Sequence, residues 1–181
     1  MTPSERAAPP GTIRTTVTFL EMTERPAARH RVAPPGKVAI LHAEEPPAHF
    51  YRYLYRAIGR DYNWSIRWHL NDEELLARIR AVGVEIYVLY ANGVPAGLCE
   101  FDFAHMPLVQ VLYFGITPEF LGRGYGRFFL DQMLELAWDR GPERIRLNTC
   151  TLDHPRALPM YQRFGFAPYA QEEQDLPLLR V

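Results

Sequence analysis

The sequence has little cysteine, little net charge and no long apolar run. Its two cysteines, Cys99 and Cys150, lie in different apolar segments and form no C-x-x-C pair. A disulfide framework is therefore not indicated, and we expect a protein of a reducing compartment, the cytoplasm. No N-terminal segment resembles a signal peptide. No apolar run approaches the roughly 18 residues that a membrane helix needs, so we expect no membrane partner.

The net charge of −1 over 181 residues excludes the strong positive field that is typical of nucleic-acid-binding proteins. The six histidines show no metal-ligand spacing, so we expect no metal. Eight of the 16 prolines fall in the first 47 residues, which predicts irregular segments there. We expect an irregular N-terminal tail at 1–12 and a single domain at 13–181.

Residue patterns predict a mixed α/β protein. Alternating and β-branched segments predict strands at 13–20, 38–42, 85–90, 94–103, 109–116, 144–151 and from 166 onward. Helical spacing predicts helices at 48–59, from 71, at about 124–140 and at 155–164. Asn92-Gly93 predicts a tight hairpin turn, and Asn71 with Glu74 forms a capping-box pattern. We expect a central twisted, mostly antiparallel sheet of six to seven strands flanked by helices. Its strands 109–116 and 144–151 should be neighbours, with 109–116 buried on both faces.

Three glycines alternate in the segment Leu121-Gly122-Arg123-Gly124-Tyr125-Gly126, between a predicted strand and an amphipathic helix. Glycine lets the backbone approach a ligand closely and adopt positive φ. Free N–H groups and the helix dipole favour an anion at a helix start. By itself this pattern is weak, because a turning loop would also use glycine. It has neither the Gly-Lys-Ser/Thr of a Walker loop nor the spacing of a dinucleotide fingerprint.

The context of the loop is more specific. Residues 114–126 resemble motif A of the GNAT superfamily of N-acetyltransferases, in which an apolar strand and a Pro precede a Gly-x-Gly segment that opens a helix. Residues 157–166 resemble motif B, Ala-x-x-x-Tyr-x-x-x-Gly-Phe, about 35 residues downstream. The resemblance implies a GNAT-like fold and an acyl-CoA-dependent N-acyltransferase that uses acetyl-CoA as co-substrate.

The resemblance also implies where acetyl-CoA binds. The strand before the loop would splay from its neighbour and contact pantetheine through the backbone of Phe114, Gly115 and Ile116. Gly115 would suit a bulge or a close ligand approach. The pyrophosphate would lie on Leu121, Gly122, Arg123, Gly124, Tyr125, Gly126 and Arg127. Leu121 stands where the family usually has Gln or Arg, and His154 stands where it often has Asn. A cofactor contact and a solvent-exposed position are both open for His154.

Two residues are candidates for catalysis. Tyr161 matches the tyrosine that commonly protonates the departing thiolate, and packing on its helix is the alternative. Many relatives have a Glu at the position matched by Gln110, and Gln cannot usefully accept a proton. We therefore predict Glu100, on the neighbouring strand, as the general base. In the alternative, Glu100 and Asp102 share a solvent-exposed face. Cys150 has no recognisable base partner and is expected to be a structural thiol.

The acceptor side is expected in residues 50–70, where aromatic residues gather with Arg52, Arg56 and Arg67. This pattern suits a small amine that carries a ring or a carboxylate, with the acceptor-binding residues Tyr51, Tyr62, Trp64 and Trp68. The alternative is the core and rim of a helix pair. We expect direct attack of the amine on the thioester in a ternary complex. A CoA-binding sensor without catalysis and a protein Lys or N-terminal acetyltransferase remain alternatives, and a homodimer is left open.

Overall fold

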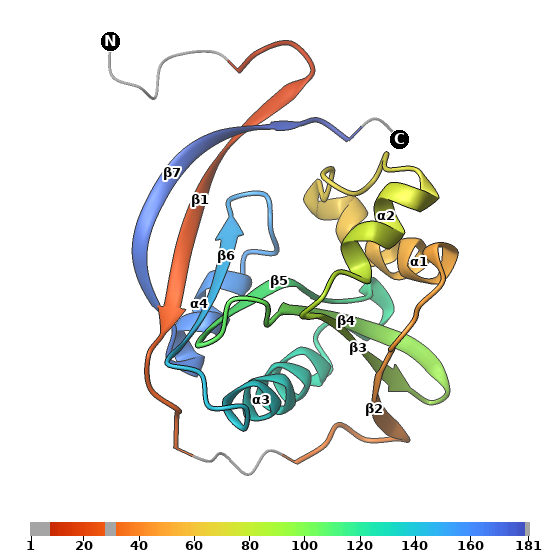
Figure 1. The fold of residues 1–181 in the computed structure, drawn as a ribbon, viewed down its shortest axis with the longest axis vertical. Coiled ribbons are helices and arrows are strands. Elements are labelled where there is room, and N and C mark those ends of the chain that lie inside the picture. The colour runs from red at the N-terminus through yellow and green to blue at the C-terminus, as the bar shows by residue number, and fades with distance from the viewer. Residues whose placement is uncertain (1–7, 28–31, 180–181) are drawn as a thin grey trace.

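The computed structural model describes residues 8–27 and 32–179, so most of the predicted tail at 1–12 lies outside the described residues. One seven-stranded sheet has the strand order β2-β3-β4-β5-β6-β1-β7 (Figure 1). Its strands are β1 (Thr12–Met22), β2 (Val38–His42), β3 (Val84–Ala91), β4 (Val94–Asp102), β5 (Leu108–Ile116), β6 (Arg144–Cys150) and β7 (Ala167–Pro177). The helices are α1 (Ala48–Gly59), α2 (Asp72–Ile79), α3 (Tyr125–Trp138) and α4 (Ala157–Phe164), with 3-10 turns η2 (Arg60–Tyr62) and η3 (Pro118–Phe120).

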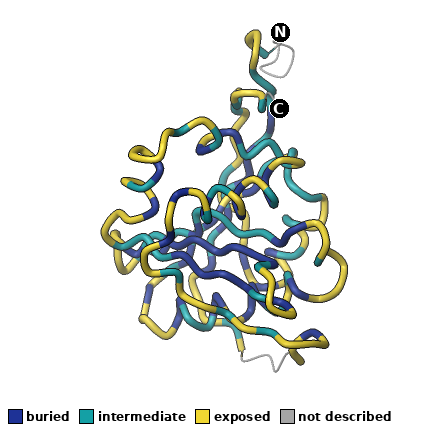
Figure 2. The backbone as a smooth tube through the Cα atoms, turned by 90° about the vertical axis from the view of Figure 1, so that its right-hand side faces the viewer, coloured by how far each residue is buried: buried dark blue, intermediate teal, exposed yellow. Residues whose placement is uncertain are grey.

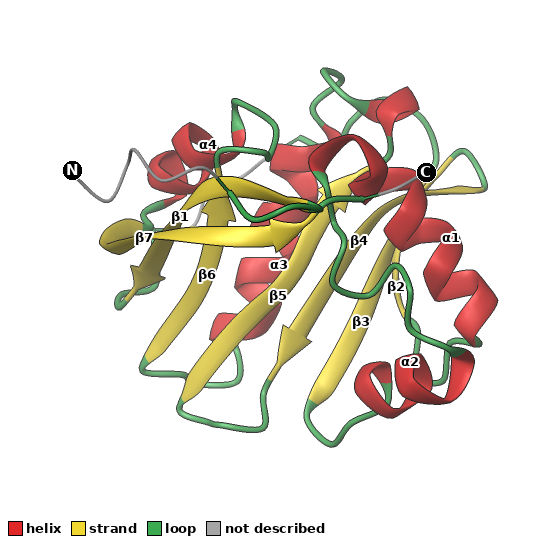
Figure 3. Ribbon diagram, turned by 90° about the horizontal axis from the view of Figure 1, so that it is seen from above, coloured by secondary structure: helices red, strands yellow, loops and turns green. Residues whose placement is uncertain are grey.

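Helices cover both faces of the sheet, and the alternation of β3 shows how (Figure 3). Ile86 and Val88 pack into the hydrophobic cluster of α1 and α2, whereas Tyr87 and Leu89 pack into the cluster of α3 and α4. Successive strand residues point to opposite faces, so a strand covered on both sides is apolar throughout. Figure 2 shows the resulting buried centre with exposed loops around it.

The central strands part from each other at one place. β5 and β6 form the parallel pair of the sheet, and their ladder joins only Leu108–Gln110 to Arg144–Arg146. Beyond it the two strands diverge (Figure 1). The other strand pairings among the described residues are antiparallel. The predicted neighbours and the predicted mostly antiparallel sheet are both confirmed.

The N-terminal strand takes a position that the residue patterns did not predict. β1 lies between β6 and β7, with Val17 opposite Cys150 and Thr12 opposite Pro177. The far end of β7 arches toward the α1–α2 side (Figure 1). There Asn63, in a left-handed conformation with φ 55°, donates from Nδ2 to the carbonyl of Pro177 (3.0 Å) and accepts from the N–H of Leu179 (2.8 Å). Residues 174–179 are called the C-terminal strap below.

The turn and the capping box predicted from local sequence patterns are present, but the burial of one strand differs from the prediction. Asn92 and Gly93 take positive φ in the β3–β4 turn, and Asn71 with Glu74 forms both hydrogen bonds of a capping box. The strand predicted to be buried on both faces is β5, which is central. Its residues 112–115 are only half-buried. The reason is the divergence of β6, which leaves that stretch beside open space.

Candidate active site

A continuous cavity of about 1190 Å³ follows the gap between β5 and β6. It starts at the glycine loop, passes the exposed edge of β5 and ends at residues 62–67 after α1. The wall also includes residues of β1 and β7. The lining includes Phe114, Gly122, Gly124, Arg127, Asp153, Tyr161, Tyr55, Tyr62, Trp64, Arg67, Tyr113, Gln174 and Leu176.

The glycine loop forms an open cradle at one end of the cavity. Gly124 precedes α3 with φ 87°, and a Cβ built on it would meet no atom within 4 Å. The N–H of Phe128 bonds to the carbonyl of Gly124 (3.1 Å) as the first hydrogen bond of α3. The amides of the three preceding residues therefore come before the helical ladder and are available to an anion. The cradle fits a pyrophosphate group.

Most of the predicted cofactor residues line this cavity. They are Phe114, Gly115, Ile116, Leu121, Gly122, Gly124, Gly126, Arg127 and His154. Arg123 and Tyr125 do not line it. The guanidinium of Arg123 lies 6.0 Å from the Phe120 ring centroid. The hydroxyl of buried Tyr125 donates to the carbonyl of Pro35 (3.2 Å). Their backbone remains part of the loop.

The β5 edge differs in detail from the prediction. The register with β4 shifts between Tyr113 and Val111, so the bulge falls at Leu112 rather than at Gly115. A Cβ on Gly115 would lie 2.3 Å from Cγ2 of Ile58. Gly115 thus admits the close approach of α1 rather than forming a bulge. Alternate residues of an extended strand turn their N–H and C=O groups to opposite sides. The stretch beyond the β6 ladder therefore presents backbone polar groups to the gap.

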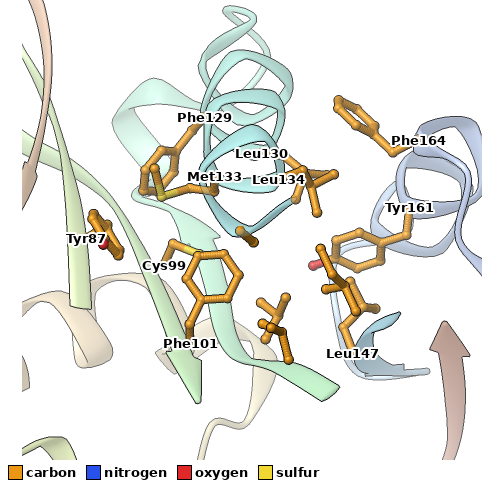
Figure 4. Close-up of a cluster of buried hydrophobic side chains, with 14 of the residues drawn as sticks. Tyr87, Cys99, Phe101, Phe129, Leu130, Met133, Leu134, Leu147, Tyr161 and Phe164 are labelled. Atoms are coloured by element: carbon orange, nitrogen blue, oxygen red, sulfur yellow. The ribbon is translucent and has the colours of Figure 1, made fainter. Parts of the chain in front are cut away.

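Tyr161 extends from α4 into the cluster of buried side chains drawn in Figure 4, and it also lines the cavity. Its ring packs edge-on against Phe114 at 6.5 Å and against Phe166 at 6.0 Å between centroids. In Figure 4 the hydroxyl points away from α4 toward the sheet beside Leu147. Burial raises the pKa of this phenol, and the charge of Asp153 raises it further. At neutral pH the group is a protonated donor.

Glu100 lies behind the cavity wall rather than in it. Its side chain is fully buried, and Oε2 accepts hydrogen bonds from Nη1 of Arg67 and from the hydroxyl of Tyr51, each at 2.6 Å. Burial raises the pKa of the carboxyl, and the charge of Arg67 offsets part of that rise. This placement excludes the solvent-exposed alternative. It also differs from the prediction of a base that contacts the attacking amine, because Arg67 stands between Glu100 and the cavity.

The predicted acceptor residues divide into two groups. Tyr62 and Trp64 line the cavity. Tyr51 lies on the buried face of α1 and bonds to Glu100, and Trp68 packs on the guanidinium of Arg56 at 5.0 Å. Tyr51 and Trp68 therefore have no place in the cavity wall. Helical spacing was the signal for Tyr51, because it shares the buried face of α1 with Leu54, Tyr55 and Ile58.

A comparison with protein families identifies the family of this chain. A family model described as "Acetyltransferase (GNAT) family" matches residues 41–166. The chain belongs to this family. The matched part of this acetyltransferase-family chain contains the glycine loop and Tyr161, and it leaves out β1 and β7. No curated protein matches the chain.

Solved structures share the fold with this acetyltransferase-family chain at low identity. A GCN5-related N-acetyltransferase from Sphaerobacter thermophilus has 15% identity and a TM-score of 0.66, over 94% of this chain and 55% of its own. The ribosomal-protein-S18-alanine N-acetyltransferase from Escherichia coli has 14% identity and a TM-score of 0.60, over 80% and 96%. An aminoglycoside acetyltransferase from an uncultured soil metagenomic sample has 13% identity and a TM-score of 0.58, over 71% and 87%. The chain spans 64% of the first matching structure, a Staphylococcus epidermidis protein of unknown function.

The sequence pattern placed Arg52, Arg56 and Arg67 together on the acceptor side. Of these three, Arg67 lines the cavity, whereas Arg52 pairs with Asp72 at the surface. Two other parts of the wall were not predicted. Gln174 and Leu176 of β7 enter the wall through the arch of that strand. Asp153 is the only carboxylate that lines the cavity within the described part of the chain. Its Oδ2 accepts from the hydroxyl of Thr149 (2.7 Å) and the N–H of Cys150 (2.9 Å). Its place directly before His154 was the available signal.

The described residues contain neither a metal-ligand cluster nor a membrane-spanning helix. No group of three or more His, Cys, Asp and Glu in residues 8–27 and 32–179 could hold a metal ion. No helix of the described residues is long and apolar enough to cross a membrane.

Proposed function

We propose that the protein transfers the acetyl group of acetyl-CoA to the amine of a small-molecule acceptor by direct attack in a ternary complex. The observation that carries this proposal is the continuity of the cavity from the glycine loop, along the splayed edge of β5, to the aromatic end beyond α1. A donor and an acceptor can therefore occupy one continuous cavity, with the gap between β5 and β6 at their meeting point.

Donor binding follows from the loop and the strand edge. The amides at the start of α3 and the guanidinium of Arg127 offer hydrogen bonds and positive charge to the pyrophosphate. The pantetheine arm contains amide groups and can pair with the free backbone groups of residues 112–116, as an added strand would. This arrangement holds the thioester near Phe114 and Tyr161.

The reaction needs one bond to form and one to break. The nitrogen of a neutral amine attacks the thioester carbon, and the carbon–sulfur bond then breaks as CoA thiolate leaves. Tyr161 supplies a proton to that sulfur, since burial keeps its phenol protonated at neutral pH. A positioned general acid of this kind contributes about 10²–10⁴ in rate.

The amine must lose a proton, and we assign its acceptor to Asp153. This carboxylate lines the cavity, and its Oδ2 is held by Thr149 and Cys150. Oδ1 forms no hydrogen bond within the described ranges, so it is available to an ammonium or to a bridging water. Glu100, which the sequence predicted as the base, instead holds Arg67.

The C-terminal strap beside the acceptor end favours a small molecule over a protein tail. Asn63 ties the C-terminal strap to the turn after η2 through two hydrogen bonds. Gln174 of β7 and Tyr62 thus lie in one continuous wall. An extended peptide would need an open groove at this point.

The test is amine-dependent release of free thiol from acetyl-CoA. The panel contains small amines with and without a carboxylate, a polycationic aminoglycoside and a short peptide with a free N-terminus and a lysine. We expect thiol release with at least one small amine, matched by acetylated product in a mass spectrum. Acetyl-CoA binding without acetylation of any amine would favour the sensor, and acetylation of the peptide alone would favour the protein acceptor.

A further inference from the structure

The geometry points to an acceptor that carries a carboxylate, bound by Arg67 at the far end of the cavity. This inference rests on the proposed function and narrows its substrate class. A carboxylate-bearing acceptor would distinguish this chain from enzymes that act on polycations, because Arg67 is positively charged and would repel a polycation.

Arg67 is held rigidly at the face of the sheet opposite Tyr161. Tyr113 and Phe114 are adjacent on β5 and point to opposite faces, toward the α1–α2 cluster and the α3–α4 cluster. The guanidinium of Arg67 lies 4.7 Å from the Tyr113 ring centroid, whereas the Tyr161 ring lies near Phe114. Arg67 therefore stands across the gap from the group that protonates sulfur, on the side where the acceptor would enter.

The guanidinium is only partly used by the protein. Nη1 donates to Glu100 and to Tyr51, each at 2.6 Å. Nε and Nη2 have no hydrogen-bond partner in residues 8–27 and 32–179, and neither is among the fully buried polar atoms without a partner, so both are accessible from the cavity that Arg67 lines. The planar fork of Arg matches a carboxylate through two parallel hydrogen bonds, so a carboxylate is the partner that fits.

The neighbouring side chains explain why the fork keeps its orientation. The hydroxyl of Tyr55 accepts from the backbone N–H of Arg67 (3.2 Å). The rings of Tyr55, Trp64 and Tyr113 pack on one another, with centroids 5.0–5.3 Å apart. These aromatic walls flank the guanidinium and offer apolar surface to the rest of the acceptor.

The charge balance of the wall favours an anionic group. Of the six charged Asp, Glu, Lys and Arg side chains that line the cavity, five are arginines: Arg67, Arg78, Arg127, Arg156 and Arg163. Asp153 is the sixth. Arg127 belongs to the first turn of α3, at the donor end of the cavity, whereas Arg67 lies on the α1–α2 side of β5, beside Tyr113. The positive charge of these arginines would repel a polycationic acceptor. An amine that carries a carboxylate can instead place its carboxylate on Arg67 and its amine near Asp153.

The first test compares acceptors that differ only in the carboxylate. Phenylalanine and phenylalaninamide have the same ring, and the amide has the less basic amine, so amine reactivity alone favours the amide. We expect kcat/KM for thiol release to be about tenfold or more higher for the amino acid, the usual effect of a hydrogen bond to a charged group. Equal or better turnover of the amide overturns the inference but leaves the proposed function standing.

The second test measures binding without turnover. Carboxylates from acetate to 3-phenylpropionate and their matched amides are titrated into the protein with CoA present. The parent should bind carboxylates more tightly than amides. Glu100→Gln should tighten the binding of 3-phenylpropionate, because it removes the competing negative charge. The double variant Arg67→Gln with Glu100→Gln leaves no buried charge unpaired. It should bind 3-phenylpropionate about tenfold or more weakly than the parent does.

The outcomes of the two tests are separable. If no amine is acetylated, the proposed function fails, and the binding comparison still decides the role of Arg67. If no carboxylate binds the parent more tightly than its amide, the role of Arg67 fails, whatever the turnover. If the double variant does not fold, the comparison of the parent with Glu100→Gln still decides. The proposal predicts tighter carboxylate binding in Glu100→Gln, whereas a purely structural ion pair predicts no change in carboxylate affinity.

Discussion

Nη1 of Arg67 lies 2.6 Å from Oε2 of Glu100, and both side chains are buried beside the cavity. The two residues are 33 positions apart in sequence. Oε1 of the same carboxyl is buried without a hydrogen-bond partner among the described residues. Burial of one unpartnered oxygen favours the neutral carboxyl, whereas Arg67 favours the charged one. The balance raises the pKa of Glu100 above 4.5.

This balance predicts how stability depends on pH. The folded state holds the Glu100 proton to higher pH than the unfolded chain does. The resulting stabilisation is present below the ordinary pKa of about 4.5 and is lost as pH rises through the folded-state value. We expect the free energy of unfolding of the parent, relative to Glu100→Gln, to decrease over that interval and then level off. Urea titrations at several pH values measure it, and a difference that rises with pH would contradict it.

A second prediction distinguishes the two candidate bases. Asp153→Asn keeps an acceptor oxygen for Thr149 and Cys150 but cannot take the amine proton. We expect its kcat at neutral pH to fall about 10²-fold and to recover as pH rises, because the neutral fraction of amine grows about tenfold per unit below the amine pKa. Glu100→Gln should keep the pH profile of the parent. Recovery with pH in Glu100→Gln but not in Asp153→Asn would return the base role to Glu100.

Tyr161→Phe tests the general acid. The phenol should matter only as the thiolate departs, so kcat should fall about 10²-fold while the Kd for acetyl-CoA stays nearly unchanged. Tyr87→Phe is the matched control. It removes another buried tyrosine hydroxyl, which bonds to Glu85 (2.6 Å) outside the cavity. An unchanged kcat in Tyr161→Phe would make Tyr161 a packing residue.

The C-terminal strap can be loosened without disturbing the backbone of its anchor. Asn63→Gly keeps the left-handed conformation but removes both side-chain hydrogen bonds to the strap. We expect a higher KM for the acceptor and acceptance of bulkier amines, with an unchanged Kd for acetyl-CoA. Asn92→Gly, at φ 53° in the β3–β4 turn, is the control and should leave both constants unchanged. Identical effects of the two variants would show that the strap does not shape the acceptor end.

Local sequence patterns predicted most of the fold. The Asn92-Gly93 turn and the Asn71–Glu74 capping box depend on residues within a few positions of each other, so the sequence alone reveals them. The insertion of β1 between β6 and β7 joins residues more than 130 positions apart, such as Val17 and Cys150. Alternation specifies which face of a strand is buried, but it does not specify the partner strand.

The candidate site also has local parts that the sequence predicted and long-range parts that it did not. The loop and Tyr161 lie in contiguous motifs, and both reach the cavity. Arg67, Glu100 and Tyr51 come together only in three dimensions, so a single sequence reads each as an isolated charged or aromatic residue. The ion pair between Glu100 and Arg67 could therefore not be predicted from the sequence.

The most direct test of the account is the affinity of acetyl-CoA for Gly124→Glu, measured by calorimetric titration beside Gly141→Glu. Gly141 follows α3 with φ 71° and, like Gly124, has no atom within 4 Å of an added Cβ. Both variants thus place a strained carboxylate in open space, at opposite ends of one helix. The account predicts that both fold, that Gly141→Glu binds acetyl-CoA like the parent, and that Gly124→Glu does not bind it. Unchanged affinity in a folded Gly124→Glu would contradict the assignment of the pyrophosphate to this loop.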